Sequence, residues 1–99
     1  MLRAILIAGA AIAQTWSVVP AAAQSAQAMA QNCFVCHGPG AKGSQAIVAL
    51  AGRPEELIVQ QMLAFKTDQR HGTIMNRIAK GYDEAQIAAI AAHLAKLPR

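Results

Sequence analysis

Two cysteines and a histidine lie within five consecutive residues, Cys33-Phe34-Val35-Cys36-His37, and these are the only two cysteines of the chain. Residues at positions i and i+3 of a helix lie on the same face, so both sulfurs can reach one planar molecule. His37 follows directly and places an imidazole beside them. The segment therefore predicts a site that uses both thiols and the imidazole together.

This C-x-x-C-H spacing is the attachment signature of c-type haem. The two thiols would form thioethers with the two vinyl groups of one porphyrin, and His37 would ligate the iron. A zinc site needs four ligands, and only His71 and His93 remain to complete one. A thioredoxin-type motif needs a βαβ unit that this sequence lacks, and a plain disulfide would leave His37 without a role. The sequence therefore predicts one covalent haem c, bound by Cys33, Cys36 and His37.

Residues 1–23 have the pattern of a secretory signal peptide. Arg3 supplies a positive charge, Ala4–Ala13 contains only non-polar residues, and Ala21-Ala22-Ala23 ends the segment with small side chains. This order is typical of a cleaved leader. A retained anchor is the alternative, but ten residues rise only about 15 Å as a helix, against roughly 30 Å of hydrocarbon. We expect cleavage after Ala23, a periplasmic protein and no membrane span after cleavage.

Residues 24–99 are expected to form one all-α domain, because no alternating apolar and polar run of strand length follows the leader. So short a domain buries little apolar surface and usually needs an additional stabilising group, such as a disulfide, a metal or a cofactor. A covalent haem would provide one. Helices are predicted from Ser25 to Cys36, from Pro54 onward and from Asp83 to Leu97, with loops over 38–53 and from Thr67 to Gly81.

Two of these helices have start signals. Proline is tolerated in the first turn, and Glu55 and Glu56 after Pro54 suit the positive end of the helix dipole. Asp83 and Gln86 have the spacing of a capping box. These signals predict where the second and the last helix begin.

The sixth ligand of the iron has four candidates. Met29 precedes His37 by eight residues on the same predicted helix and cannot easily reach the opposite haem face. Met62 lies in an apolar helical stripe, where methionine usually fills core space. Met75 lies in a loop 38 residues after His37, which is long enough to cross the ring. We expect Met75 to be the ligand, with His71 and Met62 as alternatives.

With these residues in place, the chain resembles a small class I cytochrome c, in particular the cytochrome subunit of flavocytochrome c sulfide dehydrogenase. The matching segments are Cys33–Gly38, Leu50-Ala51-Gly52, Gln61-Met62 with Phe65, and Thr73 to Tyr82. The resemblance implies a cytochrome c domain over 24–99, with three main helices and long loops around the haem. It also implies an axial Met75 and a Tyr82 beside the haem pocket. His93 stands where such cytochromes often carry an aromatic residue, which predicts a partly buried packing histidine.

Together these inferences predict an electron carrier and not an enzyme. A His/Met pair fills both axial positions of the iron and leaves no open site for peroxide or oxygen. A haem peroxidase or gas sensor stays open only if Met75 does not bind. The partner implied by the resemblance is a flavoprotein dehydrogenase that oxidises a small reductant such as sulfide. The alternative is a free periplasmic shuttle to a terminal oxidase or reductase.

The chain is basic, with nine Lys and Arg against five Asp and Glu. Arg70, Arg77 and Lys80 cluster around Met75. They would steer an acidic docking face, pair with haem propionates or form a solvated surface. No dense basic stripe accompanies them, so a nucleic-acid partner is not expected.

Overall fold

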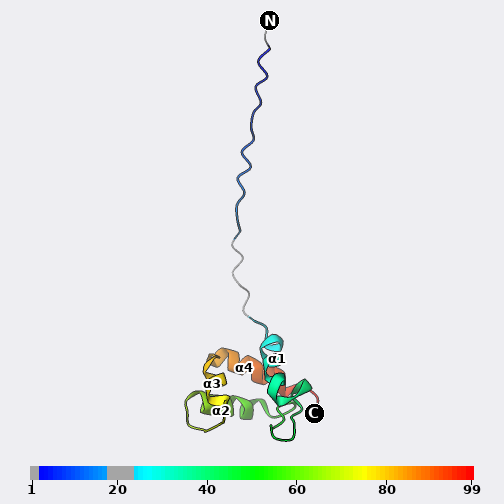
Figure 1. The fold of residues 1–99 in the computed structure, drawn as a ribbon, viewed down its shortest axis with the longest axis vertical. Coiled ribbons are helices and arrows are strands. Elements are labelled where there is room, and N and C mark those ends of the chain that lie inside the picture. Colours follow the sequence, from blue (N-terminus) through cyan, green and yellow to red (C-terminus); the bar gives the residue numbers. More distant parts are fainter. Residues whose placement is uncertain (1–2, 18–23) are drawn as a thin grey trace.

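The computed structural model describes residues 3–17 and 24–99, and these residues contain helices and no strand. The elements are α1 (Ala26–His37), the 3-10 turn η1 (Pro39–Ala41), α2 (Glu55–Lys66), α3 (Met75–Lys80) and α4 (Glu84–Ala95). Figure 1 shows the four α-helices gathered at one end of the chain. The expectation of an all-α domain is confirmed, and its three long helices are α1, α2 and α4.

Residues 3–17 have no regular secondary structure and are exposed. The expected cleavage site, Ala21-Ala22-Ala23, lies outside the described residues. Within the described ranges, none of the helices has the length and apolar character needed to cross a bilayer.

Helix α1 begins where the sequence predicts, because Ser25 caps it. The Ser25 side chain accepts a hydrogen bond from the backbone N–H of Ala28 at 3.1 Å, which satisfies one of the free N–H groups of the first turn. Met29 and Ala30 are buried on this helix. The helix ends at Gly38, whose φ of +86° no longer continues it.

Helices α2 and α4 also start at their predicted signals. Pro54 precedes α2, and Glu55 and Glu56 occupy its first turn. The capping box of α4 is complete: Asp83 accepts from Gln86 N at 2.7 Å, and the Gln86 side chain accepts from Asp83 N at 2.9 Å. The capping box satisfies backbone groups in the first turn of α4, and the acidic residues of α2 suit the positive end of its dipole.

The predicted loop from Thr67 to Gly81 is wrong in its second half, where Met75–Lys80 forms α3. Six residues are too few to show a helical period in the sequence, and Ile74 at the N-cap offers no side-chain hydrogen bond. The helix is therefore stabilised by its surroundings. Ala79 is fully buried, which anchors α3 on the rest of the domain.

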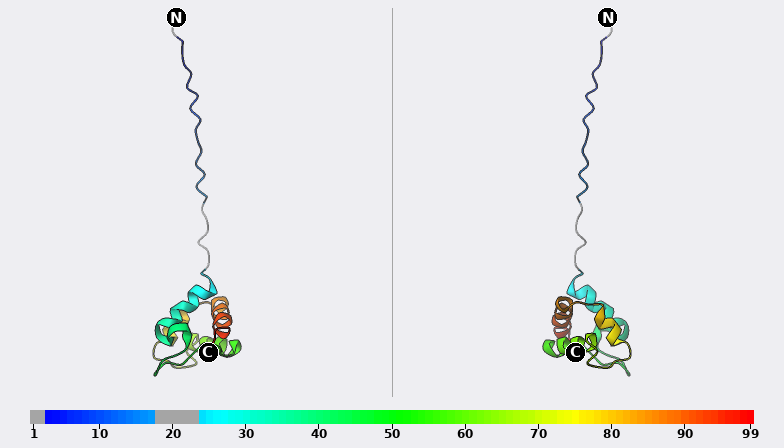
Figure 2. Two further views of the ribbon diagram at one scale, coloured as in Figure 1. Left: turned by 90° about the vertical axis from the view of Figure 1, so that its right-hand side faces the viewer. Right: turned by 90° about the vertical axis from the view of Figure 1, so that its left-hand side faces the viewer.

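The core lies where α4 packs against both α1 and α2. Figure 2 shows α1 and α4 side by side, crossing at a steep angle, with α2 beneath them. The buried residues of α4 are Ile87, Ile90, Ala91 and Leu94, and the last three form one cluster with buried residues that include Met29, Ala30 and Ile58. The candidate site residues lie at the C-terminal end of α1 and at the start of α3.

Candidate functional site

Cys33 and Cys36 lie on the last turns of α1, and both thiols are free. Cys33 is half-buried against the core, and this burial raises the pKa of its thiol, whereas Cys36 is exposed. The helical conformation confirms the predicted i and i+3 placement on one face. The two thiols near the C-terminal end of α1 are therefore placed so that one planar molecule can bond to both.

His37, the last residue of α1, is buried, with 9% of its surface exposed. Its Nδ1 lies 2.6 Å from the backbone oxygen of Val48. A carbonyl only accepts, so Nδ1 carries the proton and donates, and Nε2 is left with its lone pair. This is the tautomer and the orienting contact that a metal-ligating histidine requires.

A tight turn after His37 brings Val48 back to the imidazole. The N–H of Gly43 donates to the carbonyl of His37 at 2.6 Å, which closes the chain onto the end of α1. At Gly38 the backbone has a φ of +86°, and a Cβ there would lie 2.6 Å from the oxygen of Gly43. Only glycine fits this position, so the sequence Cys36-His37-Gly38 is matched to the turn.

Met75, the expected sixth ligand, is the first residue of α3 and is half-buried. A Cβ placed on Gly72 would lie 2.9 Å from Cε1 of Phe65 and 3.3 Å from Cβ of Met75, so these three residues pack closely. Met62 is half-buried and packs against the core. Met29 is buried in the core, with 4% of its surface exposed.

The remaining candidate residues are spread over the domain. His71 is exposed, and His93 is half-buried on α4 as expected. Tyr82 is half-buried and packs against the core, and its carbonyl accepts a hydrogen bond from Nζ of Lys66 at 2.5 Å. In residues 3–17 and 24–99, no three His, Cys, Asp or Glu side chains gather into a group that could hold a metal ion.

The residues present fit a covalently attached haem. The donor set consists of two accessible thiols, an imidazole whose free nitrogen is Nε2, and a thioether at the start of α3. Apolar side chains that are only partly buried are available to cover a large apolar disc: Phe34, Leu50, Val59, Met62 and Tyr82. Sequence reasoning missed the Val48 carbonyl, which carries no sequence signal because every residue has one.

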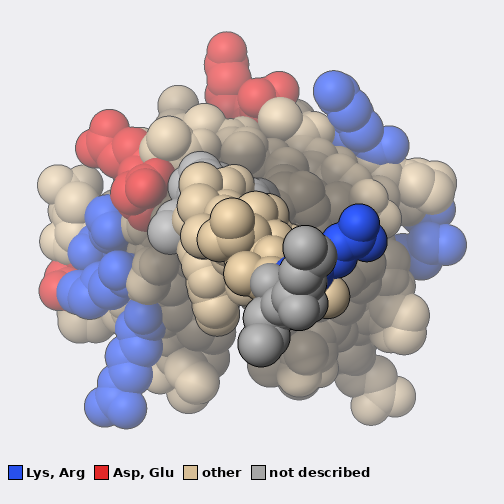
Figure 3. Space-filling model, turned by 90° about the horizontal axis from the view of Figure 1, so that it is seen from above, with Lys and Arg blue, Asp and Glu red and all other residues tan. Residues whose placement is uncertain are grey.

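The basic cluster around Met75 is partly engaged within the chain. Nζ of Lys80 donates to Oδ1 of Asp68 at 2.5 Å, and this ammonium holds the pKa of the Asp68 carboxyl below its usual value. The guanidinium of Arg70 lies over the ring of Phe65, 5.1 Å from its centroid. Arg77 is exposed. In the view of Figure 3, Lys and Arg are mixed with Asp and Glu around the edge of the molecule.

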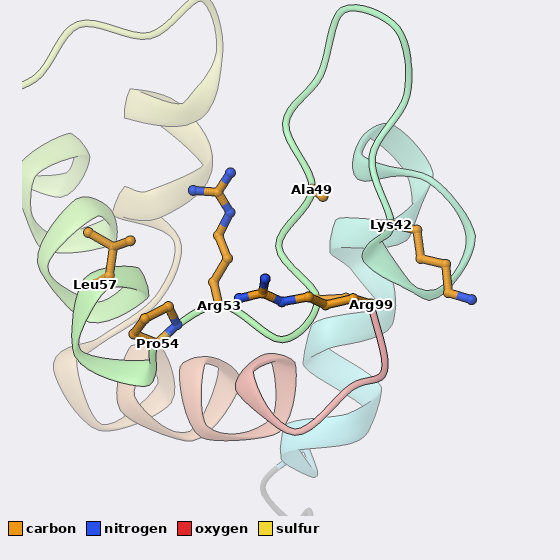
Figure 4. A pocket seen from close by; sticks show the side chains of 7 residues that line it. Lys42, Ala49, Arg53, Pro54, Leu57 and Arg99 are labelled. Carbon is orange, nitrogen blue, oxygen red and sulfur yellow. The ribbon is translucent and has the colours of Figure 1, made fainter.

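A second group of basic residues lines a pocket of about 340 Å³ below the loop that follows α1. Its lining residues are Lys42, Ala49, Ala51, Arg53, Pro54, Leu57 and Arg99. Figure 4 shows Arg99 reaching across toward Arg53, while Lys42 points away from both. Arg99 also donates to the carbonyl of Gly52, from Nε at 3.3 Å and from Nη2 at 3.2 Å.

Comparison with known proteins gives a consistent result. The family model described as cytochrome c matches residues 22–98. The chain is 33% identical to the thiosulfate dehydrogenase electron acceptor of Thiomonas intermedia, over 97% of this chain and 45% of that protein. It is 30% identical to the cytochrome subunit of sulfide dehydrogenase of Chlorobaculum tepidum, over 84% of this chain and 76% of that protein.

Among solved structures, cytochrome c4 of Acidithiobacillus ferrooxidans superposes with a TM-score of 0.63 at 38% identity, over 66% of this chain and 38% of that one. This chain therefore spans less than half the length of the Thiomonas relative and of the cytochrome c4 chain. The comparisons therefore show a cytochrome c domain over residues 22–98 of this chain.

Proposed function

The chain belongs to the cytochrome c family, an electron-carrier family whose cofactor is covalently bound haem c, and we propose that it is an exported mono-haem acceptor of electrons from a flavoprotein dehydrogenase. The proposal includes a cytochrome c domain over 24–99, preceded by a cleaved leader over 1–23. The single observation that carries the site is the orientation of His37 by the Val48 carbonyl at 2.6 Å.

In the proposed site, Cys33 and Cys36 form the two thioether bonds to the haem, and His37 and Met75 are the axial ligands. The haem, when bound, supplies a centre that gains and loses single electrons. Val48 keeps Nε2 of His37 free for the iron by accepting from Nδ1. Tyr82, half-buried on the segment after α3, contributes to the wall of the haem pocket.

If His37 and Met75 both bound the iron, they would leave no open coordination position for a substrate. The role that follows is an electron carrier that depends on a partner enzyme for its chemistry.

The proposed partner is a flavoprotein that oxidises a small sulfur compound. Support comes from the two relatives, which are named as the electron acceptor of one dehydrogenase and the cytochrome subunit of another. The alternative is a free periplasmic shuttle that delivers electrons to a terminal oxidase or reductase. Within the cluster of Arg70, Arg77 and Lys80, Lys80 is paired with Asp68 and the guanidinium of Arg70 lies over Phe65. Fewer of these side chains are therefore available to contact an acidic partner than the sequence suggests.

Salt dependence separates these two functions. The exported protein is purified at low and at high salt, and reduction of its haem by a sulfide-oxidising flavoprotein is followed by stopped flow. A permanent subunit co-purifies with a flavin-containing chain at both salt concentrations. A transient shuttle is purified without a flavin-containing chain. The rate of reduction of its haem falls as the ionic strength rises past about 0.1 M, because salt screens the charges that guide docking. If no flavin chain co-purifies and no flavoprotein reduces the haem, the proposed partner is wrong.

A further inference from the structure

Asn76, the residue directly after Met75, makes four hydrogen bonds through its side-chain amide. Its Oδ1 accepts from the N–H of Gly72 at 2.8 Å. Its Nδ2 donates to the carbonyl of Phe65 at 3.1 Å and to the carbonyl of Arg70 at 2.7 Å, and lies 3.3 Å from Oδ1 of Asp68. One side of the amide meets a donor and the other meets only acceptors, so its orientation is unambiguous.

These partners cover the whole connection between α2 and α3. Phe65 is in the last turn of α2, while Asp68, Arg70 and Gly72 follow along the loop. Asp68 has a φ of +57°, an uncommon conformation for a residue other than glycine. One side chain therefore joins the last turn of α2 and three loop residues to the first turn of α3.

Met75 depends on this tie for its position. Helix α3 has six residues and no side-chain cap at Ile74, and so short a helix has little stability of its own. Cβ of Met75 packs closely beside Gly72, and the N–H of Gly72 is bonded to Asn76. The backbone at Met75 is thus held through Gly72, which packs against Met75 and donates a hydrogen bond to the side chain of Asn76.

We propose that Asn76 is the positioning residue for Met75, and that it sets how tightly the thioether is kept on the iron. The inference rests on the proposed function, in which Met75 is an axial ligand. The role requires an amide: a carboxylate of the same shape can accept from Gly72, but it cannot donate to the carbonyls of Phe65 and Arg70. It would also place a second negative charge beside Asp68.

The test uses the holoprotein and measures how readily free imidazole displaces the methionine in the ferric state. Asn76→Asp is compared with the wild type, and Thr67→Ala is the matched control. Thr67, at the start of the same loop, donates a hydrogen bond to the carbonyl of Leu63 in α2 at 2.8 Å and is not among the hydrogen-bond partners of the Asn76 side chain. Losing one or two hydrogen bonds that hold Met75 should tighten apparent imidazole binding about tenfold in Asn76→Asp. The control should stay within about twofold of the wild type.

Two further measurements separate a positioning role from a general loss of structure. The ferric iron–thioether absorption band should weaken in Asn76→Asp, while far-ultraviolet circular dichroism shows unchanged helix content. Met75→Ala is the reference, and it should lose the band and bind imidazole more tightly than either variant. If Met75→Ala keeps the band, the proposed ligation by Met75 is wrong. If Met75→Ala behaves as expected but Asn76→Asp binds imidazole like Thr67→Ala, only the role of Asn76 is overturned.

Discussion

At the scale of single residues, Met62 and Met75 make opposite predictions. Met75→Ala should abolish the ferric iron–thioether band and lower the reduction potential, because the thioether favours the reduced iron relative to nitrogen ligands. Met62→Ala should leave the band intact and mainly lower the free energy of unfolding. Because Met62 is only half-buried, this loss should fall below the roughly 2–5 kcal/mol typical of a fully buried methionine. A lost band in Met62→Ala with an unchanged band in Met75→Ala would reverse the assignment.

Gly38 makes a second residue-scale prediction. A Cβ there would lie 2.6 Å from the oxygen of Gly43, at a φ of +86°, so Gly38→Ala should lower the free energy of unfolding of the holoprotein by about 1–3 kcal/mol. Gly40→Ala is the matched control, because Gly40 also has a positive φ but its Cβ would meet nothing closer than 3.7 Å. Equal losses in denaturant unfolding of the two variants would contradict the close contact at Gly38.

At the scale of elements, the capping box of α4 is a local source of stability. Asp83→Ala removes the acceptor for Gln86 N and should lower the free energy of unfolding by about 0.5–2 kcal/mol. Glu84→Gln lies one residue later, is exposed and should change it by less than about 0.5 kcal/mol. Denaturant unfolding of the holoproteins measures both. Similar values for the two variants would mean that the cap adds no stability.

The ion pair that joins the loop to α3 predicts a pH dependence. The Lys80 ammonium lowers the folded-state pKa of Asp68 below its ordinary value of 3.8. The stability from this pair is therefore fully present above that ordinary value and is lost as the pH falls through the lowered pKa. Unfolding curves of the wild type and Asp68→Asn should differ at neutral pH, converge in acid and converge at high salt. A difference that persists unchanged in acid would contradict the pairing.

The sequence predicted the helices that carry their own signals. Pro54 and the pair Asp83 and Gln86 act on backbone groups within three residues, so their effect can be inferred without a fold. Helix α3 was missed because it has no such signal at Ile74 and is held by long-range contacts to Asn76. The predicted ligand at Met75 therefore lies at the start of a helix and not in a loop.

The candidate site likewise contains residues that spacing predicts and contacts that only the folded chain provides. Cys33, Cys36 and His37 could be identified from spacing alone, because their chemistry depends on a fixed separation along one helix. The partner of His37 could not, since the Val48 carbonyl is 11 residues away and reaches the imidazole only through the turn at Gly38 and Gly43. The tie between Asn76 and the α2–α3 loop is likewise a property of the folded chain.

At the scale of the whole molecule, the buried interface of α4 with α1 and α2 is small and made of aliphatic side chains. The proposed ligands lie on two separate segments, with Cys33, Cys36 and His37 at the end of α1 and Met75 at the start of α3. A domain of this size gains much of its stability from what it binds. Covalent attachment would therefore link the two halves of the site as well as supply the redox centre.

The most direct test is a tryptic digest of the exported protein, denatured and analysed by mass spectrometry. The peptide that ends at Lys42 contains Cys33, Cys36 and His37. It should begin at Gln24 and carry the added mass of one haem, and the same peptide from a Cys33→Ala/Cys36→Ala protein should carry none. A peptide from the exported wild type that is free of haem, or joined only by a disulfide between Cys33 and Cys36, would contradict covalent attachment and the electron-carrier role derived from it.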